Sequence, residues 1–254
     1  MLATVDRPTV ITYAALLVVT AAAWLAMLWS PMASDDMGGM EMAMMPALGD
    51  GVAFVAAWGI MMAAMMLPSA MPMIGLYAAT QRGAVNATMR TVAVITFALM
   101  YVALWALTGV PIYFASVALM AMAPATLAST IAAVLIVAGA FQLSPFKHVC
   151  LRHCRSPLGF LLGHWRAGWR GAVSMGGAHG LYCLGCCWAL MLVLVVAGAM
   201  GLPWVLLIAC VVAAEKVLPR GEWIARLTGV ALALLGVAAA VEPGLAALLR
   251  AWAM

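Results

Sequence analysis

Charge is scarce in this sequence. Of its 254 residues, only 12 are lysine or arginine and 8 are aspartate or glutamate, whereas 68% are hydrophobic. A soluble domain needs a far more polar surface, so a water-soluble globular fold is excluded. The chain also lacks a GxxxxGK[ST] phosphate loop, which argues against an ATP-driven pump. We expect lipid to surround most of the chain, and we expect no nucleic-acid partner.

Long apolar runs replace the missing charge. They reach about 20 residues, the length that a helix needs to cross a hydrocarbon core of roughly 30 Å. They do not alternate strictly between polar and apolar residues, which favours helices over a β-barrel. The sequence predicts an all-α, polytopic transmembrane helix bundle that forms a single domain over 1–254. Seven spans are expected, over residues 10–29, 51–77, 91–114, 125–143, 172–199, 202–218 and 224–241.

The positions of lysine and arginine predict the orientation. If the N-terminus lies inside, every basic residue except Arg250 falls in or beside an inner loop, as the positive-inside rule requires. We therefore predict an inner-membrane protein of bacterial type, with its N-terminus in and its C-terminus out. A methionine-rich outer loop over 30–50 and a basic His/Cys inner loop over 144–170 follow from this topology. A cleaved signal peptide at the first span is the alternative.

Methionine is in excess, with 22 residues. Thioether sulfur is a soft ligand that suits Cu(I) and is a poor ligand for magnesium or calcium. In the second span, helical periodicity predicts two methionine stripes, although methionine is also ordinary packing material. The outer-loop candidates are Met32, Met37, Met40, Met42, Met44 and Met45, and the stripes are Met61 with Met65 and Met62 with Met66.

The fifth span carries the most specific pattern. His179, Cys183 and Cys186 stand at i, i+4 and i+7, so one helix face presents an imidazole and two thiols, with Met175 one turn earlier. These are ligands for a soft or borderline metal. Cysteine also occurs as a small buried hydrophobe, but histidine inside a membrane span is costly and usually functional. Cys187 is rotated away from His179 and is treated as secondary.

A second cluster of His and Cys lies in the inner loop, at His148, Cys150, His153 and Cys154. The cytoplasm keeps thiols reduced, which favours a metal site over a disulfide. The alternative is a basic amphipathic segment on anionic headgroups. His164 is interpreted as an interfacial side chain and Cys210 as packing. Glu215 and Lys216 are interpreted as closing the sixth span near the inner interface, with a proton or cation relay as the alternative.

Depth relates the second and fifth spans to each other. At about 1.5 Å rise per residue, Met61 to Met66 and Cys183 all fall near the middle of the bilayer. We therefore predict that the two spans face each other across one shared site.

Three segments carry a family resemblance: MMAAMMLPSAMPM, the stretch CLRHCRSPLGFLLGHWRAGWRGAVSMGGAHGLYCLGCCWALM, and EKVLPRG at 215–221. In these the chain resembles a bacterial family of predicted metal-binding integral membrane proteins of unknown function. The likeness covers most of the chain after the first span. It implies a membrane location and metal binding. It does not identify a catalysed reaction.

We therefore predict a membrane protein that binds and handles a soft transition metal by transport, delivery or sensing. Copper as Cu(I) is the first expectation and zinc the second. The expected partners are the lipid bilayer, the metal ion, and a metallochaperone or cuproenzyme. Two alternatives stay open. One is a thiol redox protein that cycles Cys183 and Cys186 and passes electrons to a quinone. The other is a structural or assembly subunit that binds no metal.

Overall fold

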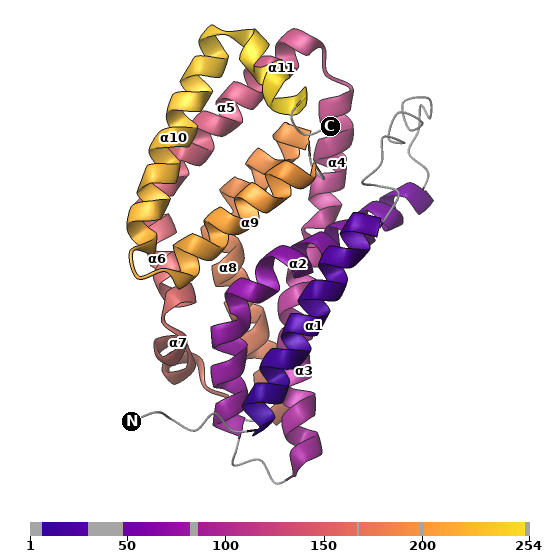
Figure 1. The fold of residues 1–254 in the computed structure, drawn as a ribbon, viewed down its shortest axis with the longest axis vertical. Coiled ribbons are helices and arrows are strands. Elements are labelled where there is room, and N and C mark those ends of the chain that lie inside the picture. The colour runs from indigo at the N-terminus through magenta and orange to yellow at the C-terminus, as the bar shows by residue number, and fades with distance from the viewer. Residues whose placement is uncertain (1–6, 30–47, 82–85, 167, 199–200, 252–254) are drawn as a thin grey trace.

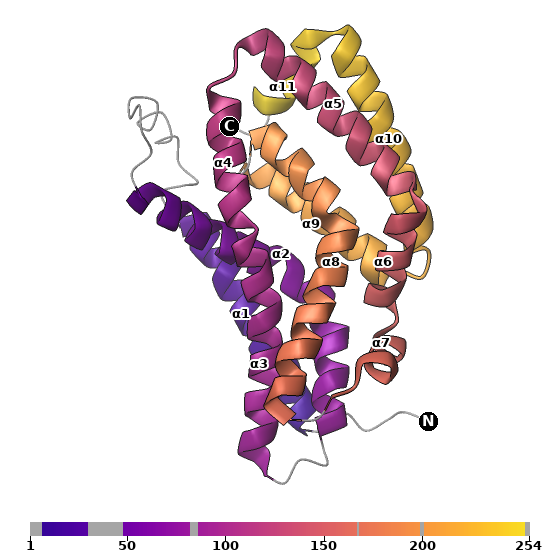
Figure 2. The ribbon, with the colours of Figure 1, turned by 180° about the vertical axis from the view of Figure 1, so that it is seen from behind.

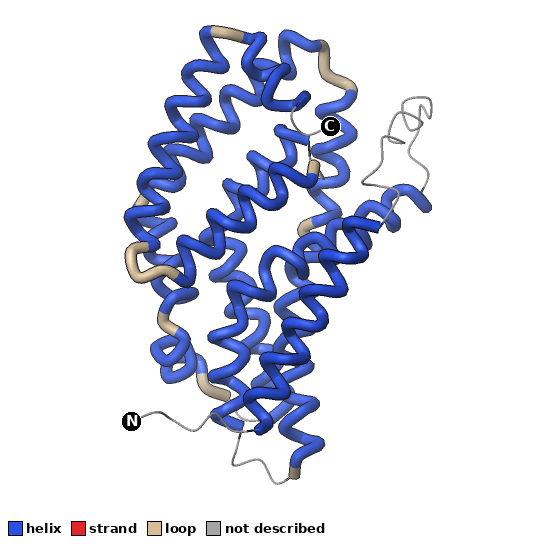
Figure 3. The backbone as a smooth tube through the Cα atoms, viewed as in Figure 1, coloured by secondary structure: helices blue, strands red, loops and turns tan. Residues whose placement is uncertain are grey.

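The computed structural model describes residues 7–29, 48–81, 86–166, 168–198 and 201–251. Within these ranges the chain consists of helices joined by short turns, and no strand occurs in them (Figure 3). The all-α prediction is confirmed. The helices are α1 (Arg7–Trp29), α2 (Leu48–Thr80), α3 (Ala87–Leu107), α4 (Gly109–Met120), α5 (Pro124–Leu143), α6 (Pro145–Arg155), α7 (Pro157–His164), α8 (Gly168–Gly198), α9 (Leu202–Val217), α10 (Gly221–Val241) and α11 (Pro243–Ala251).

Six helical stretches in the described ranges are long and apolar enough to cross a membrane, one fewer than the seven predicted. The difference lies at the expected span over 202–218, which is α9. With 16 residues α9 is only about 24 Å long, less than the hydrocarbon thickness. Proline sets both limits, because Pro203 stands in its first turn and Pro219 stands two positions after its last residue, Val217.

The outer surface is apolar. Leu99, Phe114, Leu181 and Leu234 are 63%, 65%, 59% and 65% exposed, and each belongs to one of the long apolar stretches. A water-soluble protein rarely exposes so many large apolar side chains on contiguous surfaces. The helices therefore have the outward faces of a protein that is surrounded by lipid.

The helices pack in pairs. α5 packs along α10, α3 along α8 and α1 along α2, and α9 runs obliquely between the α5–α10 pair and α2 (Figures 1 and 2). Glycine allows the closest approach. A Cβ atom at Gly139 of α5 would lie 2.7 Å from the Gly229 carbonyl oxygen of α10. Small residues at such crossings bring membrane helices into close contact.

The predicted third span, 91–114, extends over two helices, because α3 and α4 are separated at Thr108. Pro111 cannot donate a backbone hydrogen bond in the first turn of α4. The break is tied to α2, since the Trp58 indole donates a hydrogen bond to the Thr108 hydroxyl at 3.0 Å.

The basic segment over 144–170 is largely helical. The Ser144 side chain caps α6 by accepting a hydrogen bond from the Lys147 backbone amide at 3.3 Å, and proline starts both α6 and α7. α6 packs against α8 and buries Lys147 and Leu151. This packing brings the inner His/Cys segment to the thiols of α8.

Candidate functional site

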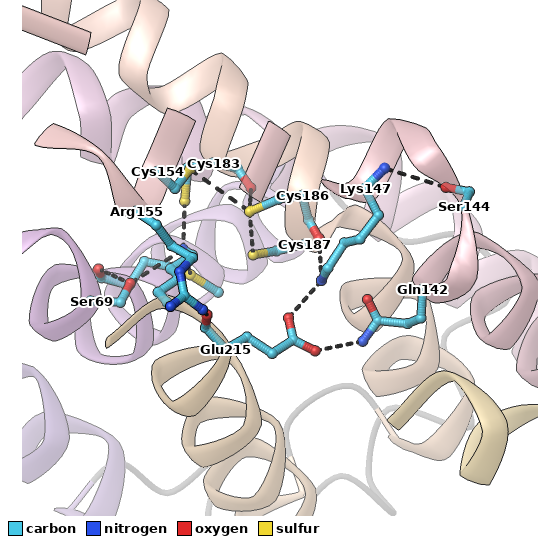
Figure 4. A network of polar contacts seen from close by, with 12 residues as sticks. Ser69, Gln142, Ser144, Lys147, Cys154, Arg155, Cys183, Cys186, Cys187 and Glu215 are labelled. Carbon is cyan, nitrogen blue, oxygen red and sulfur yellow. Dashed lines mark hydrogen bonds and ion pairs between the residues drawn. The ribbon is translucent and has the colours of Figure 1, made fainter. Parts of the chain in front are cut away.

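Four thiols meet where α6 lies against α8, and we call Cys154, Cys183, Cys186 and Cys187 the thiol cluster (Figure 4). The Cys186 sulfur lies 3.2 Å from the Cys187 sulfur and 3.9 Å from that of Cys154. The Cys186 thiol also donates to the Cys183 carbonyl oxygen at 3.1 Å. The three thiols of α8 are buried and Cys154 is half-buried.

Helical spacing explains the cluster. Residues three and four positions apart lie on the same helix face, which groups Cys186 and Cys187 with Cys183. Cys187, which the sequence prediction treats as secondary, therefore lies in this cluster with its sulfur beside that of Cys186. Cys154 comes from α6, and the sequence pattern predicts it in the inner-loop cluster with His148, Cys150 and His153 instead.

A lysine ammonium enters the cluster from α9. The Nζ atom of Lys216 lies 2.9 Å from the Cys183 sulfur, 3.3 Å from the Ser69 hydroxyl oxygen and 3.9 Å from the Met66 sulfur. Tyr101 of α3 completes the connection, because its hydroxyl donates to the Met66 carbonyl oxygen and lies 3.0 Å from the Cys183 sulfur. The second and fifth predicted spans are thus joined at one place, through side chains of α3 and α9.

A buried ion pair lies beside the thiols (Figure 4). Lys147 Nζ lies 2.6 Å from a carboxylate oxygen of Glu215 and donates to the Cys186 carbonyl oxygen at 2.7 Å. The Gln142 amide donates to the other Glu215 oxygen at 2.7 Å. Glu215 and Lys216 stand in the last turn of α9, and they are only 1% and 8% exposed, so their side chains are buried in the protein. Burying the charges of Lys147 and Glu215 is costly, so each needs the other as its partner.

Arg155 fastens α6 to the end of α9. Its guanidinium donates hydrogen bonds to the carbonyl oxygens of Glu215, Leu218 and Pro219, at 2.9, 2.6 and 2.8 Å. The last carbonyls of a helix have no partner within the helix and attract cations. Because Cys154 is the preceding residue, this contact also fixes the thiol of α6 against α8.

Replacing Arg155 with alanine is expected to lower the free energy of unfolding by about 1–3 kcal/mol, since three hydrogen bonds to a charged group are lost and two of them are exposed. Thermal unfolding in detergent, followed by circular dichroism, measures the effect. Arg152→Ala is the control, because Arg152 is an exposed arginine of the same helix. Equal melting temperatures for the two variants would contradict a fastening role.

His179 lies in an aromatic cage. Its ring stacks on Tyr101 and Phe97, with centroids 5.4 and 6.1 Å apart, and Phe160 contacts it edge-on at 5.5 Å. Its Nδ1 atom is buried and has no hydrogen-bond partner within the described residues. A buried polar nitrogen without a hydrogen-bond partner needs an explanation, and a role as a metal ligand is one. The other predicted residues of this region, Met61, Met62, Met65 and Met175, are buried in the surrounding core.

The predicted inner cluster separates. The Cys154 thiol points to α8, whereas the His153 ring stacks on Tyr182 at 4.3 Å and its Nδ1 atom bonds the Val149 carbonyl. Cys150 lies beside Gly185, where a Cβ atom would be 3.0 Å from its sulfur. The His148 Nδ1 atom is buried and without a partner in the part of the chain that the structure covers. Met32, Met37, Met40, Met42, Met44 and Met45 lie outside the described residues.

The surroundings favour protonated thiols on α6. Burial raises the pKa of the Cys150 thiol, against a smaller lowering by Lys147. The hydrogen bond with Cys183, together with burial, raises the pKa of the Cys154 thiol well above its usual value, against a lowering by Cys186. A metal at Cys154 must therefore displace a proton.

The donor set is sulfur-rich, which fits a soft ion and not a hard one. No group of three or more His, Cys, Asp or Glu side chains in the described ranges has the geometry of a metal site. The thiols contact one another and Lys216 instead, with sulfur–sulfur distances of 3.2 Å for Cys186 and Cys187 and 3.9 Å for Cys154 and Cys186. A site with two sulfur ligands for Cu(I) needs only a pair of these donors.

Long apolar helices around a buried group of sulfur-containing side chains define a membrane-type helical protein with a sulfur-rich interior cluster. Residues 55–239 match the PpoB2 family, described as copper chaperone, and the chain belongs to this family. The match covers more than half of the chain and includes the thiol cluster and its ion pair. The predicted association with copper is thereby supported at the level of the family. No curated protein and no solved structure matches the chain.

Proposed function

We propose that this protein is an integral membrane copper chaperone that holds Cu(I) at the thiol cluster and passes it to a partner protein. The convergence of four thiols from α6 and α8 is the observation that carries the proposal. Thiolates are strong ligands for Cu(I), and the buried setting keeps competing water away. Zinc is the second candidate, because cysteine and histidine also bind it.

The surrounding residues suggest a route for the ion. Methionines of the outer loop, 30–50, would collect Cu(I), because thioethers stay unprotonated and do not form disulfides in an oxidising compartment. The thiol cluster would then hold it, with His179 and Met66 as further donors. Movement from thioether to thiolate is favourable, so delivery runs from the outside inward. This direction rests on a bacterial inner-membrane location with the N-terminus inside.

Anaerobic copper loading tests the proposal. Purified protein in detergent is treated with Cu(I), passed through a desalting column and analysed for copper and zinc. About one copper per chain is expected to be retained, as a single cluster implies. Cys210→Ser is the matched control, because Cys210 is exposed and lies outside the cluster, and it is expected to retain the same amount. Wild-type protein without stoichiometric copper would overturn the proposal.

A thiol redox function is the second candidate, because the Cys154 and Cys186 sulfurs are only 3.9 Å apart. A redox reaction would form a disulfide between Cys154 and Cys186, whereas the sequence pattern indicates a disulfide between Cys183 and Cys186. Mass spectrometry of the copper-free protein after quinone treatment separates the two functions. A disulfide between Cys154 and Cys186 together with no copper retention favours the redox function.

A further inference from the structure

Lys216 is a buried cation whose contacts are all with neutral or sulfur groups. It is 8% exposed, and no carboxylate lies within ion-pair distance of it in the regions that the structure describes. Glu215 is the adjacent residue, but its carboxylate is held by Lys147 and Gln142. A buried charge without a counter-charge is destabilising, so Lys216 requires negative charge from the cluster itself.

The other charged groups near Lys216 already have partners, so only sulfur can supply the negative charge. Lys147 and Glu215 cancel each other, and the guanidinium of Arg155 bonds backbone carbonyls at the end of α9. The nearest group to Lys216 Nζ that can carry a negative charge is Cys183, at 2.9 Å. With its thiols protonated, the buried group of Lys147, Glu215 and Lys216 carries one positive charge in excess before an ion enters.

We propose that Lys216 is the charge-compensating residue that adapts the thiol cluster to Cu(I) bound by two thiolates. This inference rests on the proposed function. Two thiolates and one Cu(I) carry a net charge of minus one, and the ammonium of Lys216 makes the buried group neutral. On binding, Cu–S bonds replace the S–H bonds of two thiols, their protons pass to solvent, and copper keeps its oxidation state. Cys183 is one ligand, and Cys154 or Cys186 is the other.

Substitution at Lys216 tests the inference through metal affinity. Cu(I) and the redox-inert Ag(I) are titrated against a competing chelator, with wild-type protein, Lys216→Met and Lys216→Arg. We expect Lys216→Met to weaken binding of both ions about 100-fold, because a close charge pair in a buried site is lost. Lys216→Arg restores the charge and is expected to bind within about fivefold of wild type. Arg152→Met, which removes an exposed charge from α6, is the control and is expected to bind as wild type does.

The outcomes are distinguishable. Wild-type protein that binds neither ion overturns the proposed function, and this inference with it. Wild-type binding together with unchanged binding by Lys216→Met overturns the inference alone. If Lys216→Met does not fold, X-ray absorption of copper-loaded wild type decides. Two thiolate ligands support the inference, whereas three thiolates overturn it, because one ammonium cannot neutralise that complex.

Discussion

Replacing Cys183 with serine is expected to weaken Cu(I) binding more than 100-fold. Cys183 is the thiol that contacts Lys216 and Tyr101, so it connects the side chains of α3 and α9 with those of α8. A hydroxyl is a hard donor and does not replace a thiolate at a soft ion. Changing a residue that only supports a ligand typically lowers metal affinity 10–100-fold, so loss of the ligand itself is expected to exceed about 100-fold.

Competition against a Cu(I) chelator of known affinity measures this effect. Cys210→Ser again provides the control, since it makes the same chemical change at an exposed position outside the cluster. Far-UV circular dichroism establishes that both variants are folded. Binding by Cys183→Ser within a few-fold of wild type would exclude Cys183 as a ligand and shift the site to Cys154, Cys186 and Cys187.

Replacing Lys147 with methionine is expected to lower the free energy of unfolding by about 3–5 kcal/mol, the typical cost of removing one partner of a buried ion pair. Glu215 would keep its bond from Gln142 but lose its counter-charge, and the Cys186 carbonyl would lose a donor. Methionine matches the length of the lysine stem, so little packing is lost. Thermal or denaturant unfolding in detergent, compared with wild type, gives the value.

The double variant Lys147→Met/Glu215→Leu tests whether the unpaired charge of Glu215 causes the loss of stability. Replacing both partners by apolar residues removes the unpaired charge, so most of the lost stability is expected to return. A double variant no more stable than Lys147→Met would show that the loss arises from packing around Lys147. Unchanged stability of the single variant would mean that the ion pair contributes nothing to the fold.

Local patterns predicted most of the helices. The apolar runs that predicted the first, second, fourth, fifth and last spans correspond to α1, α2, α5, α8 and α10, because run length and helical periodicity are properties of the chain itself. The predicted third span covers α3 and α4, and the span over 202–218 corresponds to α9, which two prolines limit to 16 residues. The orientation of the termini stays a prediction.

Part of the candidate site was also readable from the sequence. The spacing of His179, Cys183 and Cys186 predicts a shared helix face, and all three side chains are buried on α8. Their role as metal ligands stays a prediction. Cys187, predicted as secondary because it is rotated away from His179, has its sulfur 3.2 Å from that of Cys186.

The polar contacts could not be predicted, because they join residues far apart in the chain. Lys147 and Glu215 are separated by 68 positions, and Tyr101 and Cys183 by 82. No spacing rule links such positions. One signal was present: an acidic and a basic residue, Glu215 and Lys216, stand inside an otherwise apolar helix, where ionisable side chains are costly and need partners.

The placement of Lys216 on α9 has a consequence for biosynthesis. The three cysteines of α8 leave the ribosome before Lys216, which follows Cys183 by 33 positions. Until α9 folds back against α2 and α8, these thiols lack their neighbouring cation. Assembly of the thiol cluster with its neighbouring cation is therefore a late event in the synthesis of the chain.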